Sequence, residues 1–380
     1  MDDATQVPIR MATDDSAESR SEDTAVDARR LEESLEAITS ERFDEWYQHR
    51  TFRQNIRDGK PYFNGPSSVP PPERHSPSSL LQCHRKIQYR QENAPEEQDD
   101  AEGILWTGRR VEEDIVLPFL QEVVGTEQIY VRNSMWIDFT AEVINHDIRI
   151  KGVTDPVLVD EDSNPLMPTE VKTTSSLEYK DSPNTHHRAQ LHAYLAGLSD
   201  KSNQDLSEGV LIYVSRETLE MKSFHVEFDP DFWQETVLEW AKTHTEYRLD
   251  DELPPASPEQ DWECKYCSYR ERCGKGDLPH ANLGPRGFLP NYDSYPRNKV
   301  RIYFAAHDNA KLTPTLAEKY PDLAEEYAVQ SWECPNCSTS FEANDITDDL
   351  AEANQPLCPQ CAASEKLVEL QTPRLYGVGE

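Results

Sequence analysis

The sequence predicts an α/β or α+β fold, in which helices flank a mixed β-sheet and a small cysteine-rich module follows at the C-terminal end. Two observations support this prediction. Between residues 76 and 275, segments of helical periodicity are interspersed with short segments of alternating apolar and polar residues. Near the C-terminus, two Cys-Pro-x-Cys pairs lie twenty residues apart, a spacing typical of a compact module with four cysteine ligands.

The helices and strands of the central region follow from apolar periodicity and from the turn residues between them. The predicted helices are 80–89, 108–124, 185–198 and 231–248. The predicted strands are 128–132, 134–140, 146–154, 156–159, 167–173, 208–215 and 221–228. In the less regular region that follows, we expect a strand at 298–305 and a short helix within 314–329.

Shifts in composition divide the chain into regions. We expect an acidic disordered tail at 1–27, a helical extension at 28–60, a linker at 61–75, the main domain at 76–280, a connecting segment at 281–330 and the cysteine module at 331–370.

The chain is strongly acidic, with 71 acidic and 38 basic residues and a formal net charge of −33 over 380 residues. Such a charge repels nucleic acid unless basic residues gather locally. The acids are spread along the whole chain, which favours a halophilic protein over one that binds a basic partner. In molar salt the Debye length is about 3 Å, so the repulsion is largely removed. Net charge therefore does not identify the ligand.

The sequence contains no apolar run near the roughly 20 residues of a membrane span and begins without the features of a signal peptide. We therefore expect a cytoplasmic protein without membrane contact. In that compartment, eight cysteines indicate metal sites rather than disulfides.

The first group of candidate site residues is Asp155, Glu170 and Lys172. Glu170 and Lys172 are two apart on a predicted strand, so both side chains point to one face. If this strand and the preceding one form a hairpin, Asp155 joins them. Two carboxylates beside an ammonium suit Mg²⁺- or Mn²⁺-assisted hydrolysis of a phosphodiester. The alternative is an exposed Asp turn and a surface Glu–Lys pair.

Neighbouring residues extend this pattern. Gln190 and Tyr194 are four apart and share a face of the next helix, and Glu112 and Glu113 follow Gly108 on an earlier one. The order Gly-x-x-x-acid, Gly-x-x-Asp-Pro, Glu-x-Lys, Gln-x-x-x-Tyr resembles the RecB-type branch of the PD-(D/E)xK nuclease superfamily. The resemblance covers about residues 76–275 and implies a restriction-endonuclease-like fold.

The resemblance also implies roles for these residues. Asp155 and Glu170 would hold the metal with the Val171 carbonyl, and Lys172 would be the catalytic lysine. Gln190 and Tyr194 would contact the DNA backbone and shape the site. The family usually offers a histidine as a further ligand from the first helix; here that position is Glu112, or Glu113 if the register slips by one.

The second group contains four cysteines, one before the carboxylates and three after them. They are Cys83, Cys264, Cys267 and Cys273. Four thiolates suit either zinc or an iron–sulfur cluster, and the spacing alone does not separate the two. The split arrangement resembles the iron–sulfur subset of the same family, which includes CRISPR-associated adaptation nucleases and the AddB nuclease domain. It therefore implies a [4Fe-4S] cluster. Arg85 and Lys86 are candidate phosphate contacts or surface ion-pair partners.

The third group is the pair of Cys-Pro-x-Cys knuckles. They contribute Cys334, Cys337, Cys358 and Cys361, the ligand set of a structural zinc ribbon. About 40 residues form too small a core alone, so the metal would stabilise the module. Its acidic surroundings favour contact with a protein partner over contact with DNA.

Two adjacent histidines and four tryptophans lie outside these groups, and a metal role is open for the histidines. We expect His186 and His187 to be solvent-exposed at a helix start. We expect Trp106, Trp136, Trp233 and Trp240 to lie in the core rather than to stack on bases.

Together these features predict a metal-dependent DNA nuclease, an exonuclease or flap-type enzyme acting on single strands or free ends in repair, recombination or CRISPR adaptation. One alternative is a nucleic-acid-binding or scaffold protein that keeps the fold without turnover. Another is a zinc-ribbon adaptor with a structural central domain.

Overall fold

The computed structural model describes residues 34, 37–57, 68–99, 101–144, 146–342, 345–346 and 356–372. The chain divides into two compact units, Met1–Asn64 and Gly65–Glu380. The tail expected at 1–27 lies outside the described residues. In the first unit, helix α2 (Ser40–Arg57) falls within the predicted helical extension, and the Phe43 ring lies 6.2 Å from the Tyr47 ring, one turn along.

The larger sheet has the strand order β2-β5-β6-β7-β8. Its strands are β2 (Tyr130–Arg132), β5 (Val157–Val159), β6 (Pro165–Thr174), β7 (Glu208–Ser215) and β8 (Met221–Glu227). β6 and β7 are parallel, whereas the other neighbours are antiparallel. Parallel neighbours need a crossover connection, which helix α6 (Thr185–Ser202) provides. The sheet is therefore mixed, as predicted.

A second sheet has the order β1-β4-β3. Strands β3 (Trp136–Val143) and β4 (His146–Val153) form an antiparallel pair, and β1 (Arg74–His75) is parallel to β4. The short strand β1 falls inside the segment expected to be a linker, because its two residues pair with the edge of β4. Proline carbonyls just before β1 also accept hydrogen bonds from Arg248, which further ties this segment to the main domain.

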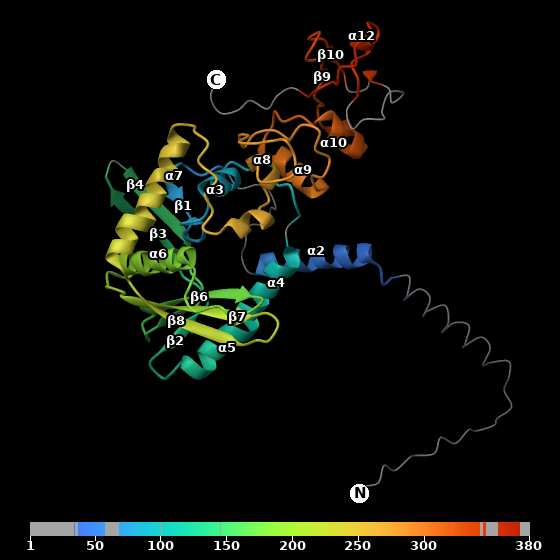
Figure 1. Cartoon of the computed structure of the whole chain (residues 1–380). Coiled ribbons are helices and arrows are strands. Elements are labelled where there is room, and N and C mark those ends of the chain that lie inside the picture. The colour runs from blue at the N-terminus through green and yellow to red at the C-terminus, as the bar shows by residue number, and fades with distance from the viewer. Residues whose placement is uncertain are drawn as a thin grey trace, which may run out of the picture. The chain divides into compact units, whose positions relative to one another are not determined.

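Helix α6 lies between the two sheets (Figure 1). Its residues from Ala189 to Leu195 are all buried, which is the pattern of a helix covered on every side. At Gly197 an added Cβ would lie 2.8 Å from Ile137 and Phe139 of β3, so the close approach of helix and sheet requires glycine. The remaining elements around this core are η1 (Pro77–Ser79), α3 (His84–Gln91), η4 (Phe232–Leu238) and α7 (Glu239–Leu249).

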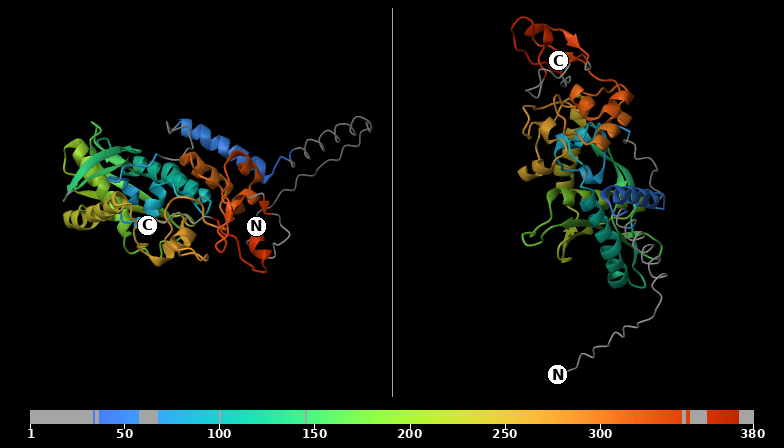
Figure 2. Two further views of the ribbon diagram at one scale, coloured as in Figure 1. Left: turned by 90° about the horizontal axis from the view of Figure 1, so that it is seen from above. Right: turned by 90° about the vertical axis from the view of Figure 1, so that its right-hand side faces the viewer.

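A continuous helical stretch covers the other face of the larger sheet (Figures 1 and 2, teal). It consists of α4 (Glu102–Val111), η2 (Glu112–Val116), α5 (Leu117–Phe119) and η3 (Leu120–Val124). Val111, Val116 and Leu120 pack against Val171 and Ile212 of β6 and β7. The η2 and η3 segments have wide π-helical turns, and such turns are frequent at functional sites.

The segment after the main domain is helical where we predicted a strand. Residues 298–305 lie in helix α9 rather than in a strand, and Val300, Tyr303 and Phe304 are buried at the i, i+3, i+4 spacing of a helix. The helix expected within 314–329 is divided at Pro321. From the end of the main domain onward the helices are η5 (Asp261–Tyr266), α8 (Arg270–Cys273), α9 (Arg297–Ala306), α10 (Pro314–Lys319) and α11 (Pro321–Glu326).

The C-terminal module is small and contains little regular structure in the described residues. Its elements are β9 (Trp332–Glu333), β10 (Ser340–Phe341) and α12 (Pro359–Ala362). Trp332 and Leu370 pack around Cys334, Cys358 and Cys361, so the cysteines form much of its core. Across the described part of the chain, every helix is too short or too polar to cross a membrane.

Two of the four tryptophans expected in the core are on the surface. Trp106 and Trp136 are 45% and 59% exposed, whereas Trp233 is buried and Trp240 is half-buried. The prediction for Trp106 and Trp136 was wrong because apolar spacing alone does not show which side of an element is covered.

Candidate active site and metal centres

The turn between β4 and β5 places Asp155 beside the middle of β6. Asp155 Oδ2 accepts a hydrogen bond of 2.8 Å from the backbone N–H of Val171, and the Asp155 carbonyl accepts one of 2.7 Å from Thr154 Oγ1. Val171 lies between Glu170 and Lys172 in sequence. The antiparallel pairing of β5 and β6 therefore brings together the three residues of the first group.

Glu170 is fully buried and forms an ion pair with Lys172, its neighbour on the same face of β6. Its Oε2 atom has no partner in hydrogen-bonding geometry among the described residues, although the Tyr194 hydroxyl lies nearby. Burial, and then the neighbouring Asp155 carboxylate, raise the pKa of Glu170 to about 8. This carboxylate is therefore poorly compensated in its charged form.

Glu112, rather than Glu113, faces this cluster from the first π-helical turn. Burial and the charges of Asp155 and Glu113 raise the pKa of Glu112 to about 7. Glu113 instead forms an ion pair with Arg110 on the surface of the helix. The structure thus brings three carboxylates, those of Glu112, Asp155 and Glu170, around a single lysine.

Lys172 remains charged despite its surroundings. Burial alone would lower its pKa, but the Glu170 and Asp155 carboxylates outweigh burial and raise the pKa. Burial likewise raises the pKa of Asp155, against the opposing effects of Lys172 and the Val171 N–H. The site therefore holds one positive charge among three acids that resist ionising together.

Gln190 and Tyr194 lie behind the carboxylates, on α6. Gln190 Nε2 donates a hydrogen bond of 2.7 Å to the Tyr194 hydroxyl. Both side chains are buried, and burial and the Glu170 charge raise the pKa of Tyr194. Their position places them against Glu170 rather than on an open surface that could meet a DNA backbone.

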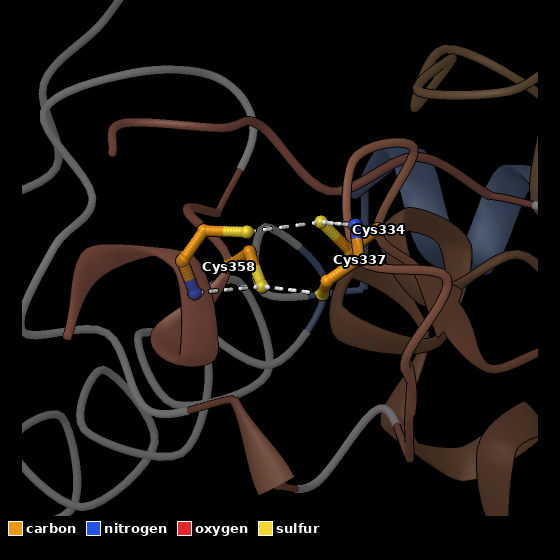
Figure 3. A group of neighbouring side chains, drawn as sticks. Cys334, Cys337 and Cys358 are labelled. Carbon is orange, nitrogen blue, oxygen red and sulfur yellow. Dashed lines mark hydrogen bonds between the residues drawn. The ribbon is translucent and has the colours of Figure 1, made fainter. Parts of the chain in front are cut away.

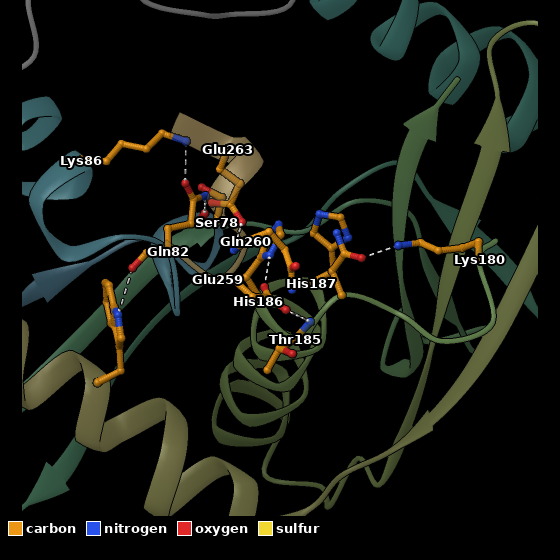
Figure 4. A network of polar contacts seen from close by, with 12 residues as sticks. Ser78, Gln82, Lys86, Lys180, Thr185, His186, His187, Glu259, Gln260 and Glu263 are labelled. Carbon is orange, nitrogen blue, oxygen red and sulfur yellow. Dashed lines mark hydrogen bonds and ion pairs between the residues drawn. The ribbon is translucent and has the colours of Figure 1, made fainter. Parts of the chain in front are cut away.

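A polar network at the start of α6 was not foreseen from the sequence (Figure 4). His187 Nδ1 lies 2.7 Å from the Tyr213 hydroxyl, and Tyr213 pairs with Lys172 across β7 and β6. Glu259, in the segment leading to the second cysteine group, accepts hydrogen bonds from Thr185 N (3.2 Å) and His186 Nδ1 (2.8 Å). Both histidines are half-buried rather than exposed, since each has a partner that only the tertiary fold supplies.

The four cysteines of the second group line one cavity. Cys83 directly precedes α3, and Cys264, Cys267 and Cys273 lie in η5, after it and at the end of α8. Hydrogen bonds also join the two chain segments that carry these cysteines. Glu97 accepts from the backbone N–H groups of Glu271 and Arg272, at 2.7 and 2.8 Å.

The position of Arg85 differs from both expectations, a phosphate contact and a surface ion pair. It is buried and donates to the Pro254 carbonyl at 2.7 Å, to Asn282 at 2.6 Å and to Cys273 Sγ at 3.7 Å. It is therefore neither a surface ion-pair partner nor available to a phosphate. Lys86 also lines the cysteine cavity, so two cations lie near the four thiols.

The ribbon cysteines form a tighter group. The sulfur atoms are 3.6 Å apart between Cys334 and Cys361 and 3.7 Å apart between Cys337 and Cys358 (Figure 3). A tetrahedral zinc with Zn–S bonds of about 2.3 Å separates its sulfurs by about 3.8 Å. In the described residues, this is the one set of at least three ligand atoms that all lie within 4.8 Å of one another.

Both knuckles also have the backbone geometry of metal-binding turns. The N–H of Cys337 donates to Cys334 Sγ at 3.5 Å, and the N–H of Cys361 donates to Cys358 Sγ at 3.4 Å. The residues present therefore fit a single tetrahedral ion. The cysteines of the second group are more widely spaced, since no three of their sulfur atoms lie within 4.8 Å of one another.

The central region of the chain matches a known protein family. The family model of the PD-(D/E)XK nuclease superfamily matches residues 49–274, more than half of the chain, so the chain belongs to this superfamily. Among solved structures, the chain is similar to the one described as the crystal structure of SSO0001. That similarity has a TM-score of 0.39 and 19% identity, and covers 60% of this chain and 95% of the other. No curated protein matches the chain.

Proposed function

We propose that the chain is a Mg²⁺- or Mn²⁺-dependent nuclease that hydrolyses phosphodiester bonds of DNA. The observation that carries the proposal is the convergence of Glu112, Asp155 and Glu170 on Lys172 at the β5–β6 hairpin. By its resemblance to the RecB-type branch, its substrate would be a single strand, a flap or a free end, in repair, recombination or CRISPR adaptation.

The chemistry of the donor set suits a divalent cation, and its carboxylate oxygens are more widely spaced than the ribbon thiols. Three buried or half-buried carboxylates face one ammonium, and their raised pKa values show that ionising all of them is unfavourable. Carboxylate oxygens are the ligands that Mg²⁺ prefers. Asp155 and Glu170 would hold the ion, with Glu112 as a further ligand and the Val171 carbonyl beside them. When bound, the ion would supply a more acidic water and stabilise charge on the leaving oxygen.

The remaining groups position and balance these carboxylates. The Lys172 ammonium stays protonated, and its place between Glu170 and Asp155 suits it to orient a water or to offset charge developing on the phosphoryl group. Tyr194, held by Gln190, restricts the carboxylate of Glu170 from the α6 side. Such hydrogen-bonding neighbours keep a metal-binding carboxylate in the orientation that the reaction needs.

We also propose a [4Fe-4S] cluster at Cys83, Cys264, Cys267 and Cys273. All four line one cavity, and their wider spacing favours a group in which each thiolate binds a different iron. Arg85 and Lys86 would offset the negative charge of the cluster and its thiolates. The cluster would join the start and the end of the nuclease domain.

The ribbon thiolates suit zinc instead, because their sulfur separations match a single tetrahedral ion. The zinc would be structural, and the module would offer a surface to a protein partner or to DNA.

A cleavage assay tests the proposed function. The protein is purified without oxygen in high KCl and incubated with end-labelled DNA single strands, flaps and duplexes, and with RNA, in Mg²⁺ or Mn²⁺. We expect metal-dependent cleavage of DNA, which EDTA abolishes. If folded protein that carries its cluster cuts none of these substrates with either metal, the nuclease proposal is wrong and a binding or scaffold role takes its place.

A further inference from the structure

Three consecutive large apolar side chains are exposed at the start of α4. Ile104, Leu105 and Trp106 are 53%, 66% and 45% exposed. Successive helical residues are about 100° apart, so the three occupy more than half of the helix circumference. We call residues 104–106 the apolar tip. An exposed apolar cluster of this kind marks a surface that binds something.

The apolar tip lies on the same helical stretch as Glu112 of the candidate active site. Glu112 follows Trp106 by six residues, which is about 9 Å along the helix axis. Between them, Gly108 lies close to β6, where an added Cβ would be 3.5 Å from Thr173 Oγ1. Arg109 is exposed, and its positive charge acts to lower the pKa of Glu112, against the larger effects that raise it. The tip, a cation and a metal-site carboxylate thus follow one another along one helix.

We propose that the apolar tip binds unpaired bases of the substrate strand whose backbone reaches the metal site at Glu112. This inference rests on the proposed nuclease function and assigns the surface that would bind the bases of its single-stranded substrate. Trp106 offers a ring on which any base can stack, whereas a duplex hides its base faces.

The charge of the chain also favours this occupant. With a net charge of −33, attraction to phosphates is weak outside local cations such as Arg109. Stacking on an aromatic ring does not depend on that attraction and is less weakened by salt.

Binding to DNA tests the inference. Trp106→Ala is compared with Trp136→Ala, which removes a somewhat more exposed tryptophan from β3 in the sheet of β1, β3 and β4. Both are made in the Lys172→Ala background, and binding to labelled single strands and duplexes is measured by fluorescence anisotropy in high KCl. We expect Trp106→Ala to weaken single-strand binding about tenfold or more, Trp106→Phe to restore it, and Trp136→Ala to leave it within twofold.

Several outcomes would overturn the inference. One is an unchanged affinity of Trp106→Ala for single strands, and another is an equal loss of affinity for single strands and duplexes. A third is a change of oligomeric state in Trp106→Ala, measured by light scattering, which would assign the apolar tip to contact with a second copy of the chain. Thermal unfolding of each variant separates lost binding from lost folding. The two proposals fail separately. If the protein binds single strands through Trp106 but does not cut them, only the nuclease proposal is contradicted. If Trp106→Ala cuts single strands as well as the wild type does, only the proposed role of the apolar tip is contradicted.

Discussion

Lys172 forms an ion pair with Glu170, which lies two residues earlier on β6 and is fully buried. The pair is not isolated, because the negative charge of the Asp155 carboxylate raises the pKa of both Glu170 and Lys172. A buried carboxylate held by one ammonium, next to a second carboxylate, is a costly arrangement for stability alone. Such arrangements are typical of functional sites, where a ligand or a reaction uses the uncompensated charge.

Replacing the lysine tests its part in catalysis. In Lys172→Ala, three carboxylates lose their one counter-charge, so we expect the cleavage rate at saturating DNA to fall about 10²- to 10³-fold. We also expect Mn²⁺ to raise the melting temperature more than in wild type. Lys222→Ala, which breaks an exposed ion pair with Asp181, is the matched control. A rate within threefold of wild type would remove Lys172 from the mechanism.

Metal binding should depend on pH. Burial, then neighbouring carboxylates, raise the pKa of Glu170 to about 8 and that of Glu112 to about 7. In the metal-free protein, a raised pKa means that these groups contribute most to stability below about pH 4.5. That contribution is lost as pH rises through 7 and 8. A cation must displace the same protons, so its affinity should rise about tenfold per pH unit for each proton released.

Isothermal titration with Mn²⁺ between about pH 6 and about pH 9, in buffers of different ionisation enthalpy, measures this release. Glu170→Gln, which cannot lose a proton, should show a shallower dependence. Affinity that does not change with pH would contradict the raised pKa values.

The two cysteine groups should lose different metals. Cys267→Ser should lose iron, sulfide and visible absorption while it keeps zinc, and Cys358→Ser should do the reverse. The expected difference follows from sulfur spacing, because the four ribbon sulfurs lie close enough to share one ion, whereas no three of the cavity sulfurs do. Elemental analysis and absorption spectra of anaerobic protein measure it. Zinc in both sites, or no metal in the cavity, would contradict the cluster.

Glu259 should position α6 for the reaction. It links the cysteine segment to Thr185 and His186 at the start of the helix that carries Gln190 and Tyr194. We expect Glu259→Ala to lower kcat about tenfold, because small displacements of supporting groups are costly to catalysis, and Glu259→Gln to recover much of the loss. Glu208→Ala, which breaks an exposed pair with His225, is the control. If the iron content falls together with the rate, Glu259 acts through the cluster instead.

Local sequence patterns predicted most of the nuclease fold. β7 has the predicted bounds, because its apolar run is short and is bounded by polar turn residues. α9 was predicted as a strand because a short apolar run fits either a helix or a strand until its buried face is known. The separate sheet of β1, β3 and β4 could not be predicted, since strand partners depend on tertiary contacts.

The candidate site shows the same division. Asp155, Glu170 and Lys172 come together as their spacing predicts, although their catalytic roles remain predictions. Tyr213 and Glu259 were missed, because their positions depend on the register of β6 against β7 and on a contact over 73 residues. Trp106 was assigned to the core for a related reason, as periodicity does not show which face is covered.

The most direct test of the metal site is cleavage of end-labelled single-stranded DNA by Asp155→Asn and Glu170→Gln beside the wild type. Asp138→Asn, which changes an exposed carboxylate paired with Arg149, is the control. If these carboxylates hold the catalytic metal, both site variants lose Mg²⁺-dependent cleavage while the control keeps it, and all four proteins retain their fold and iron. Cleavage by either site variant at the wild-type rate would contradict the assignment of this cluster as the active site.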